Sequence, residues 1–293
     1  MTNPFTKLTV AVLGSVNLDI VARVQRFPEP GETVSGASVE RHPGGKGGNQ
    51  ALAAHRLGAE VYLVACVGND NAATEALAAL RREGVRLDFC RQLEGASTGL
   101  AIILVSAEGE NQIIVAPGAN AAFTPDMLKL PPTDALIAQL EVPVETIIRA
   151  TDEAQGFFCL NAAPARPVPA ALLKRADLLV VNEIEARAMG SSLDSYAGLL
   201  AVTLGSRGAD LSKAGQQLAS SRPPAISAVD STGAGDAFTA ALTVGLVSGL
   251  PPQQVLDLAC RAGAICATRA GAQNAPWADE LLGAGQPQQG AGQ

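Results

Sequence analysis

The chain contains 293 residues, of which 47% are hydrophobic, 3% aromatic and 17% charged, with 30 glycines and a formal net charge of −7. An average domain carries roughly 25% charged residues. This chain is therefore poor in charge, and its mean hydropathy of +0.20 excludes general disorder. The acidic balance also excludes a general nucleic-acid binder, which needs a basic face to displace counterions from phosphates. It does not exclude an anionic small molecule, which needs only a local positive site.

Cysteine and histidine usage excludes further classes of site. The five cysteines are an odd number without a Cys-x-x-Cys pair, so neither a disulfide framework nor a zinc knuckle is indicated. With only two histidines, a histidine-rich metal site is excluded. No apolar run reaches the roughly 18 residues that a membrane span needs, and the N-terminus lacks a signal-peptide pattern. We therefore expect a cytoplasmic protein with no membrane or nucleic-acid partner.

In the first half of the chain, short apolar runs predict strands and a 3.6-residue periodicity predicts helices. The expected elements are a buried strand at 8–13, half-exposed strands at 20–25 and 32–40, a helix at 49–57, a strand at 61–67, a helix at 71–83, and strands at 100–105 and 112–115. A turn separates the two half-exposed strands, and another separates the last two strands. Each turn predicts an antiparallel pair.

The second half alternates strands with helices. The expected elements are strands at 135–140, 157–161, 178–181 and 199–204, and helices at 144–154, 170–175, 183–189, after Gly235, and at about 252–268. This alternation indicates an α/β sandwich around a mostly parallel sheet. The ribbons near 17–43 and 98–116 do not fit that core, so we expect them to form a separate small sheet. The segment 283–293, rich in Gly, Ala and Gln, predicts a disordered tail.

The segment 230–236 is the strongest candidate for catalytic chemistry. Gly233, Ala234 and Gly235 lead directly into an apolar-periodic stretch, so their backbone N–H groups would point out of a helix N-terminus. Such amides can hold a phosphate or stabilise charge that develops on it. Asp236 lies beside them as a carboxylate that can accept a proton from an attacking hydroxyl. The alternative is a simple glycine turn, in which Asp236 is only a charge at the start of the helix.

Commoner phosphate-binding and catalytic motifs do not occur in the sequence. The glycines at 44–48 lack the Gly-x-x-x-x-Gly-Lys-Ser/Thr spacing of a Walker loop, and no strand-turn-helix unit carries the Gly-x-Gly-x-x-Gly pattern of a dinucleotide site. No Gly-x-Ser-x-Gly occurs, and two histidines give a hydrolase triad little support.

Nine segments in order resemble the motifs of the ribokinase-like carbohydrate kinases, over about residues 8–282. The segments are 14–19, 44–50, 118–120, 139–141, 161–166, 182–185, 203–208, 230–236 and 268–273. The resemblance implies one kinase domain over 1–282, built as a three-layer α/β/α sandwich with a mostly parallel central sheet. It also implies a small antiparallel β lid, formed by strands at about 17–43 and 98–116. In this family the lid makes the dimer contact, so a homodimer is expected.

The activity that the resemblance implies is ATP-dependent phosphorylation of D-ribose at its 5-hydroxyl, giving D-ribose 5-phosphate. Asp236 would be the base, and the amides of 233–236 would form the anion hole. The residues implied to hold the sugar are Asn17, Asp19, Gly45, Lys46, Gly47, Gly48, Asn49, Glu141 and Asp236. Carboxylates and amides suit vicinal hydroxyls because they accept or donate hydrogen bonds in fixed geometry. The alternatives are a kinase of the same fold for fructose, 2-keto-3-deoxygluconate, deoxyribose or a nucleoside, and a catalytically silent sugar- or nucleotide-binding protein.

The resemblance also implies sites for ATP, Mg²⁺ and K⁺. The implied nucleotide residues are Asn182, Glu185, Thr203, Leu204, Gly205, Ser206, Arg207, Gly208, Gly235 and Cys260. Asn182 and Glu185 would position Mg²⁺ through water, and their i, i+3 spacing would place both on one helical face. The implied K⁺ residues are Asp230, Thr232, Cys266, Arg269 and Gly271. Here the sequence departs from the family pattern, because Asn274 and Ala275 stand where the family has Pro and a serine ligand.

Overall fold

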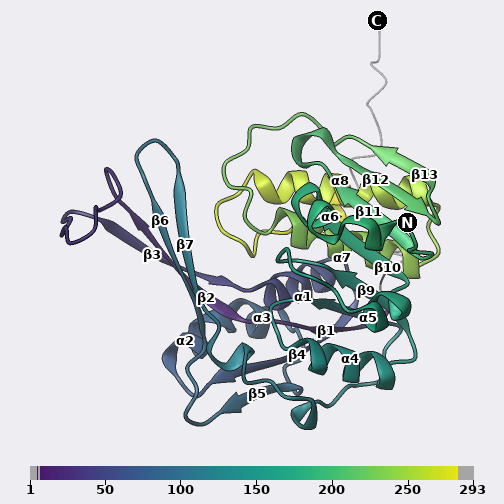
Figure 1. The fold of residues 1–293 in the computed structure, drawn as a ribbon, viewed down its shortest axis with the longest axis horizontal. Coiled ribbons are helices and arrows are strands. Elements are labelled where there is room, and N and C mark those ends of the chain that lie inside the picture. The colour runs from purple at the N-terminus through teal and green to yellow at the C-terminus, as the bar shows by residue number, and fades with distance from the viewer. Residues whose placement is uncertain (1–4, 6, 283–293) are drawn as a thin grey trace, which may run out of the picture.

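The computed structural model describes residue 5 and residues 7–282, so the predicted disordered tail at 283–293 lies outside the described residues. A large sheet lies between two layers of helices, and a small sheet projects from one side of that body (Figure 1). This arrangement confirms the predicted three-layer α/β/α sandwich with a separate small sheet.

The large sheet contains nine strands in the order β13-β12-β11-β10-β9-β8-β1-β4-β5. Their bounds are β1 (Thr9–Leu13), β4 (Glu60–Gly68), β5 (Cys90–Leu93), β8 (Ala135–Gln139), β9 (Phe157–Asn161), β10 (Leu178–Asn182), β11 (Leu199–Thr203), β12 (Ala209–Lys213) and β13 (Gln216–Ser221). All neighbours from β11 to β5 are parallel, while β12 pairs antiparallel with both β11 and β13. Parallel strands place their carboxyl ends at one edge of the sheet, where ligands bind in open α/β folds.

Two hydrophobic clusters, one on each face of the large sheet, hold the three layers together. In β1, Val10 and Val12 point into one cluster and Ala11 and Leu13 into the other, because side chains alternate along a strand. The first cluster contains side chains from α1 (Lys46–Arg56), α2 (Asn71–Ala76), α3 (Ala78–Glu83), α7 (Ala234–Val247), α8 (Pro252–Ala267) and α9 (Ala278–Leu282). The second contains side chains from α4 (Val144–Glu153), α5 (Ala170–Arg175) and α6 (Glu183–Met189).

The small sheet, which we call the lid sheet, contains four strands. In spatial order they are β3 (Ser38–Gly44), β2 (Asn17–Arg23), β6 (Gly99–Val105) and β7 (Asn111–Ala116). Both predicted antiparallel pairs, β2–β3 and β6–β7, are confirmed, and they join through β2 and β6, which run parallel. The strand predicted at 32–40 begins instead at Ser38. Gly31 and Gly36 have φ angles of 86°, which interrupt the extended backbone before it.

Several elements differ from the sequence patterns. The helix predicted at 71–83 is divided into α2 and α3, with Leu77 between them. The patterns do not predict β5, β12, β13 or α9. β5 and α9 contain only four and five residues, and β13 (QQLASS) is mainly polar and small, so none of the three has a clear hydrophobic period. Short 3-10 helices occur at η1 (Gly118–Asn120), η2 (Pro125–Met127), η3 (Gly190–Leu193) and η4 (Gly205–Arg207).

All five cysteines are free thiols, and four of them are buried. Across the part of the chain that the structure describes, no helix is both long enough and apolar enough to cross a bilayer.

Candidate active site

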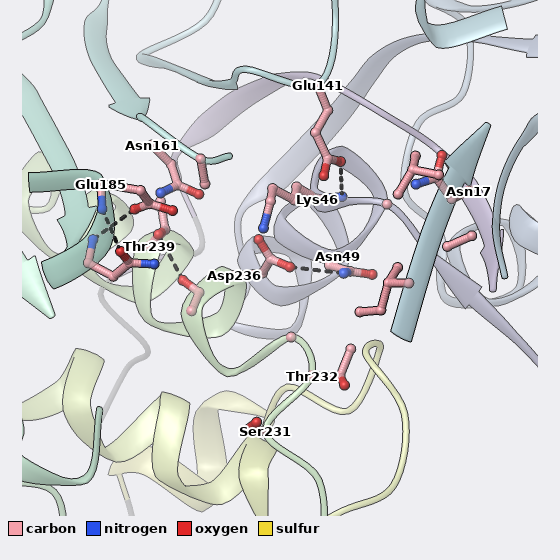
Figure 2. Close-up of a pocket in the computed structure, with 18 of the residues that line it drawn as sticks. Asn17, Lys46, Asn49, Glu141, Asn161, Glu185, Ser231, Thr232, Asp236 and Thr239 are labelled. Carbon is pink, nitrogen blue, oxygen red and sulfur yellow. Dashed lines mark hydrogen bonds between the residues drawn. The ribbon is translucent and has the colours of Figure 1, made fainter. Parts of the chain in front are cut away.

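A cavity of about 380 Å³ opens where the carboxyl edge of the large sheet meets the lid sheet and the N-termini of α1 and α7. Figure 2 shows the side chains that point into it. The predicted site residues that line the cavity are Asn17, Asp19, Gly45, Lys46, Asn49, Glu141, Asn182, Glu185, Thr203, Thr232, Gly233, Gly235 and Asp236. The fold therefore gathers predicted sugar, nucleotide and catalytic residues from distant segments around one space.

Asp236, in the first turn of α7, is a buried carboxylate that faces this cavity (Figure 2). Its Oδ2 accepts a hydrogen bond of 2.9 Å from Nδ2 of Asn49, and its Oδ1 accepts one of 2.8 Å from Nε2 of Gln50. Both donors belong to α1, which packs against α7. The two amides fix the orientation of the carboxylate. They occupy two of its roughly four acceptor positions, so the others stay open to a hydroxyl.

The N-terminus of α7 has the open geometry that the predicted anion site needs. Gly233 has a φ of 78°, which glycine adopts without strain, and a Cβ there would overlap the carbonyl oxygen of Ala272. A Cβ at Gly235, by contrast, would meet no atom within 4 Å. Gly235 lines the cavity, so the open space beside it is part of the cavity. An anion there would meet the positive end of the helix dipole and backbone N–H groups.

Carboxylates and one ammonium group lie close together in the cavity. Burial, and then the charges of Glu141 and Asp236, raise the pKa of Asp19 to about 6. Burial alone would lower the pKa of Lys46, but the charges of Asp236, Glu141 and Glu185 hold it above its ordinary value. Lys46 is therefore a positive charge inside an otherwise acidic cavity.

Glycines leave the space that polar side chains of the site need. A Cβ at Gly44 would overlap the carboxylate of Asp19, and a Cβ at Gly99 would overlap the amides of Asn17 and Asn120. Nδ2 of Asn120 donates to Oδ1 of Asn17 at 2.8 Å, which orients that amide. Gly44 and Gly99 therefore leave the room that the side chains of Asp19, Asn17 and Asn120 occupy.

The loop before α1 joins the chain after β1 to Glu141. Oε2 of Glu141 accepts hydrogen bonds from Oγ of Ser15 and, at 3.3 Å, from the N–H of Lys46. Gly47 and Gly48 do not line the cavity. The N–H of Gly48 donates to the carbonyl of Ser15 at 3.0 Å, and a Cβ at Gly47 would collide with the backbone of Ser15. Contact of these two glycines with a sugar stays a prediction.

The two predicted magnesium residues form a capping box at the start of α6. Oδ1 of Asn182 accepts from the N–H groups of Ile184 and Glu185 at 2.9 and 2.8 Å, and Oε2 of Glu185 accepts from the N–H of Asn182 at 2.7 Å. Asn182 is thus the N-cap with extended backbone, and its i, i+3 relation to Glu185 is that of the box rather than of one helical face. Both residues line the cavity, and burial raises the pKa of Glu185.

The predicted nucleotide loop follows β11. Thr203 lines the cavity, and the next residues form a turn in which the N–H of Leu204 donates to the carbonyl of Gly208 at 2.8 Å. Arg207 in this turn pairs with Glu183 of α6 at 2.6 Å. The turn is therefore attached to the helix that carries the capping box.

The side chain of Asp230 binds two of the other predicted K⁺ residues, Thr232 and Gly271. Its Oδ1 accepts from the N–H and the hydroxyl of Thr232 at 2.9 and 2.6 Å, and its Oδ2 accepts from the N–H of Gly271 at 2.9 Å. Burial alone would raise the pKa of Asp230, but these hydrogen bonds hold it below its ordinary value. Sγ of Cys266 lies 3.8 Å from the carbonyl oxygen of Thr232, and Nδ2 of Asn274 donates to the carbonyl of Gly271 at 3.1 Å.

Some predicted site residues do not line the cavity itself. They are Gly47, Gly48, Leu204, Gly205, Ser206, Arg207, Gly208, Asp230, Ala234, Cys260, Cys266, Arg269 and Gly271. Five of them, Gly47, Gly48, Leu204, Asp230 and Ala234, directly neighbour lining residues in the chain. Cys260 is buried in α8, with its Sγ 3.9 Å from the carbonyl oxygen of Ser221.

The sequence patterns missed a group of buried amides next to Asp236. Gln50 and Gln139 are 0% exposed, and Asn161 is also buried. Gln50 directly follows the predicted site residue Asn49, and Gln139 lies two residues before Glu141. The one available signal is a polar residue at the end of the otherwise apolar strand β8 (ALIAQ).

Comparison with known proteins agrees with this geometry. Residues 7–279 match the pfkB family carbohydrate kinases, and the chain belongs to this family. Ribokinase from Bacillus subtilis (strain 168) is 36% identical over 278 residues, which cover 90% of this chain and 94% of that protein. The chain is accordingly a sugar kinase, an enzyme that transfers a phosphoryl group to an alcohol.

Two solved structures share the fold closely. Ribokinase from Thermotoga maritima has a TM-score of 0.85 and 30% identity, and the match covers 94% of this chain and 98% of that one. Ribokinase from Arabidopsis thaliana, complexed with ribose and ATP, has a TM-score of 0.85 and 29% identity with the same coverage.

The raised pKa of Asp19 predicts a pH-dependent stability effect. The carboxyl has a pKa of about 6 in the fold against 3.8 as its ordinary value, so ionisation destabilises the folded state as pH rises through this window. Because one pKa unit corresponds to about 1.4 kcal/mol, Asp19→Asn should gain on the order of 1–3 kcal/mol relative to wild type between pH 4 and pH 7.5.

Denaturant unfolding of both proteins across this range measures the difference. Glu108→Gln, at an exposed carboxylate in the β6–β7 turn, is the control and should show a flat difference. A difference for Asp19→Asn that does not change with pH contradicts this account of the site.

Proposed function

We propose that this chain catalyses the ATP-dependent phosphorylation of D-ribose at its 5-hydroxyl, giving D-ribose 5-phosphate and ADP. The observation that carries the proposal is the buried Asp236 carboxylate, held by two amides directly beside the open space at Gly235. Phosphoryl transfer to a hydroxyl needs such a base next to a site for the developing negative charge. Ribose and ATP are the ligands of the Arabidopsis ribokinase described above, which supports them as substrates here.

In the proposed reaction, Asp236 accepts the proton of the 5-hydroxyl while the sugar oxygen bonds to the γ-phosphorus. The bond from that phosphorus to the bridging oxygen breaks, and ADP leaves with the oxygen. Because the N–H of Ala234 donates to the carbonyl of Ser231 at 3.2 Å, we assign the phosphoryl charge to the amides of Gly235 and Asp236. The charge resides mostly on the phosphoryl oxygens, so these amides would stabilise it directly, together with Mg²⁺, while the base acts on the sugar hydroxyl.

The sugar's other hydroxyls are assigned to Asn17, Asp19, Asn49 and Glu141. Oδ1 of Asn49 is buried and has no hydrogen-bond partner among the described residues, so it offers an acceptor that a hydroxyl can satisfy. A site built from such groups discriminates against a sugar that lacks a hydroxyl, because a buried polar atom is then left unpaired. This favours ribose over deoxyribose.

We assign the nucleotide and Mg²⁺ to the opposite side of the cavity, where Asn182, Glu185 and Thr203 lie. Asn182 and Glu185 fit Mg²⁺ held through water, because Mg²⁺ takes one or two carboxylates and retains several waters. In the described part of the chain, no group of three or more His, Cys, Asp or Glu side chains could hold a metal directly. Mg²⁺, when bound, would neutralise phosphate charge.

The Asp230 loop offers oxygen ligands of the kind that K⁺ binds. It supplies one carboxylate of lowered pKa and nearby backbone carbonyl oxygens, the donors that a hard cation prefers. The amide of Asn274 contacts the carbonyl of Gly271, next to the position of the family serine. A cation there would support the turn that leads into α7.

One assay decides between this proposal and its alternatives. We expect ADP release to depend on Mg²⁺, to increase with K⁺, and to be stimulated more by ribose than by deoxyribose, fructose, 2-keto-3-deoxygluconate or nucleosides. Stronger stimulation by another acceptor makes the protein a different kinase of this fold. Thermal stabilisation by ribose without any turnover would instead support a silent binding protein.

We also propose that the lid sheet forms a homodimer contact. On the face of the lid sheet turned away from the cavity, its exposed apolar side chains are Val39, Ile102 and Ile114, with Ile114 as much as 65% exposed. The exposed Ile113 and Val115 line the cavity instead. Apolar patches of this kind on a folded protein mark interaction sites. Light scattering should give a dimer mass for the wild type and a monomer mass for Ile114→Lys. A monomeric wild type at micromolar concentration contradicts the contact.

The open space at Gly235 makes Gly235→Ala a selective probe of the anion site. Alanine favours a helix over glycine by about 1 kcal/mol, and the added methyl meets no protein atom, so thermal stability should stay equal or rise. The methyl would occupy the space assigned to the phosphoryl group, and kcat should fall by about 10²–10³-fold, as on loss of an oxyanion donor. A stable variant that keeps kcat within about threefold contradicts the assignment.

A further inference from the structure

A chain of buried amides leads to Asp236; Gln50 and Gln139 lie behind the cavity wall, and Asn161 lines the cavity. Nε2 of Gln139 donates to Oε1 of Gln50 at 2.6 Å, and Nε2 of Gln50 donates to Oδ1 of Asp236 at 2.8 Å. The same Nε2 donates to Oδ1 of Asn161 at 3.1 Å, and Nδ2 of Asn161 donates to the carbonyl of Val180 at 3.2 Å. Gln50 and Gln139 are 0% exposed and do not line the cavity, so neither contacts a bound substrate directly.

The carboxylate dictates the direction of every hydrogen bond in this chain. An ionised Asp236 can only accept, so Gln50 must present its Nε2 to it. Oε1 of Gln50 then faces Gln139, which in turn must present its own Nε2. Oε1 of Gln139 is left buried and without a hydrogen-bond partner in the described residues. The unsatisfied acceptor thus lies at the far end of the chain, away from the carboxylate.

This arrangement is unfavourable for stability alone. A buried amide oxygen without a partner destabilises the folded state, and an apolar residue at the end of β8 would avoid that penalty. Gly14 must also lack a side chain, because a Cβ there would overlap Oε1 of Gln139. The protein therefore keeps two glutamines at positions where packing favours apolar side chains. The effect that the structure shows for them is the fixed orientation of the Asp236 carboxylate.

We propose that Gln50 is a positioning residue that holds the Asp236 carboxylate for proton transfer, with Gln139 fixing the orientation of the Gln50 amide. Asn49 donates to Oδ2 and Gln50 to Oδ1, so the plane of the carboxylate is set from both oxygens. The inference rests on the proposed function, because it takes Asp236 as the base. A displacement of about 1 Å in a catalytic group can reduce the rate on the order of 10²-fold. Loss of the hydrogen bond from Gln50 to Asp236 should therefore lower kcat.

Gln50→Leu keeps nearly the same volume and removes the donor, so it tests the proposal directly. We expect kcat to fall by about 10–100-fold, with the KM values for ribose and ATP within about threefold of wild type. In an Asp236→Asn background, the same substitution should lower kcat by less than about twofold, because Gln50 acts only through the carboxylate.

A second variant and a control complete the test. Gln139→Met should lower kcat by about three- to tenfold and add no further loss to Gln50→Leu. Thr243→Val removes another buried hydrogen bond, 2.8 Å to the carbonyl of Thr239 in α7, and should reduce stability while leaving kcat unchanged. Gln139→Met also keeps the proposal testable if Gln50→Leu fails to fold.

Three outcomes overturn the inference while leaving the kinase activity in place. They are full kcat in Gln50→Leu, multiplicative losses in the double variant with Asp236→Asn, and an equal kcat loss in Thr243→Val. A wild type without ribose-dependent turnover contradicts the proposed function itself and the inference with it.

Discussion

The burial of one carboxylate between two helix N-termini is the constraint on which the rest of the structure depends. Asp236 can stay charged in the interior only if donors compensate its lost hydration. The amides of Asn49 and Gln50 from α1 provide two hydrogen bonds, and the start of α7 adds the positive end of a helix dipole. This requirement fixes how α1 packs on α7 and therefore where the cavity lies.

The same constraint explains how an acidic chain can handle a polyanionic substrate. The formal net charge is −7, and the cavity itself contains Asp19, Glu141, Glu185 and Asp236. Positive potential comes from local sources: the amides and dipole at the start of α7, and the ammonium of Lys46, whose pKa the neighbouring carboxylates raise. The site needs no basic surface, which is why overall charge excluded nucleic acid without excluding a nucleotide.

Sequence patterns predicted six of the nine strands of the large sheet and the segments that surround the cavity. Apolar runs such as 61–67 and the hairpin turn at 106–110 predict strands directly, because burial and turn chemistry are local signals. β13 (QQLASS) was missed since its pairing with β12 depends on tertiary context and carries little hydrophobic period. Likewise, spacing alone placed Asn182 and Glu185 on one helical face, whereas they form a capping box. The row of amides behind Asp236 could not be predicted from the sequence either, because it joins α1 to β8 through contacts between residues far apart in the sequence.

The central claim is that Asp236 takes the proton from the sugar hydroxyl while other groups bind the sugar. Rapid-quench measurement of phosphoryl transfer in Asp236→Asn, with ribose affinity measured by calorimetry on the same protein, tests it most directly. The account predicts transfer slower by about 10²–10⁴-fold, as for a lost general base, with ribose affinity within about fivefold of wild type. Transfer at nearly the wild-type rate, or loss of ribose binding with transfer intact at saturating sugar, would contradict it.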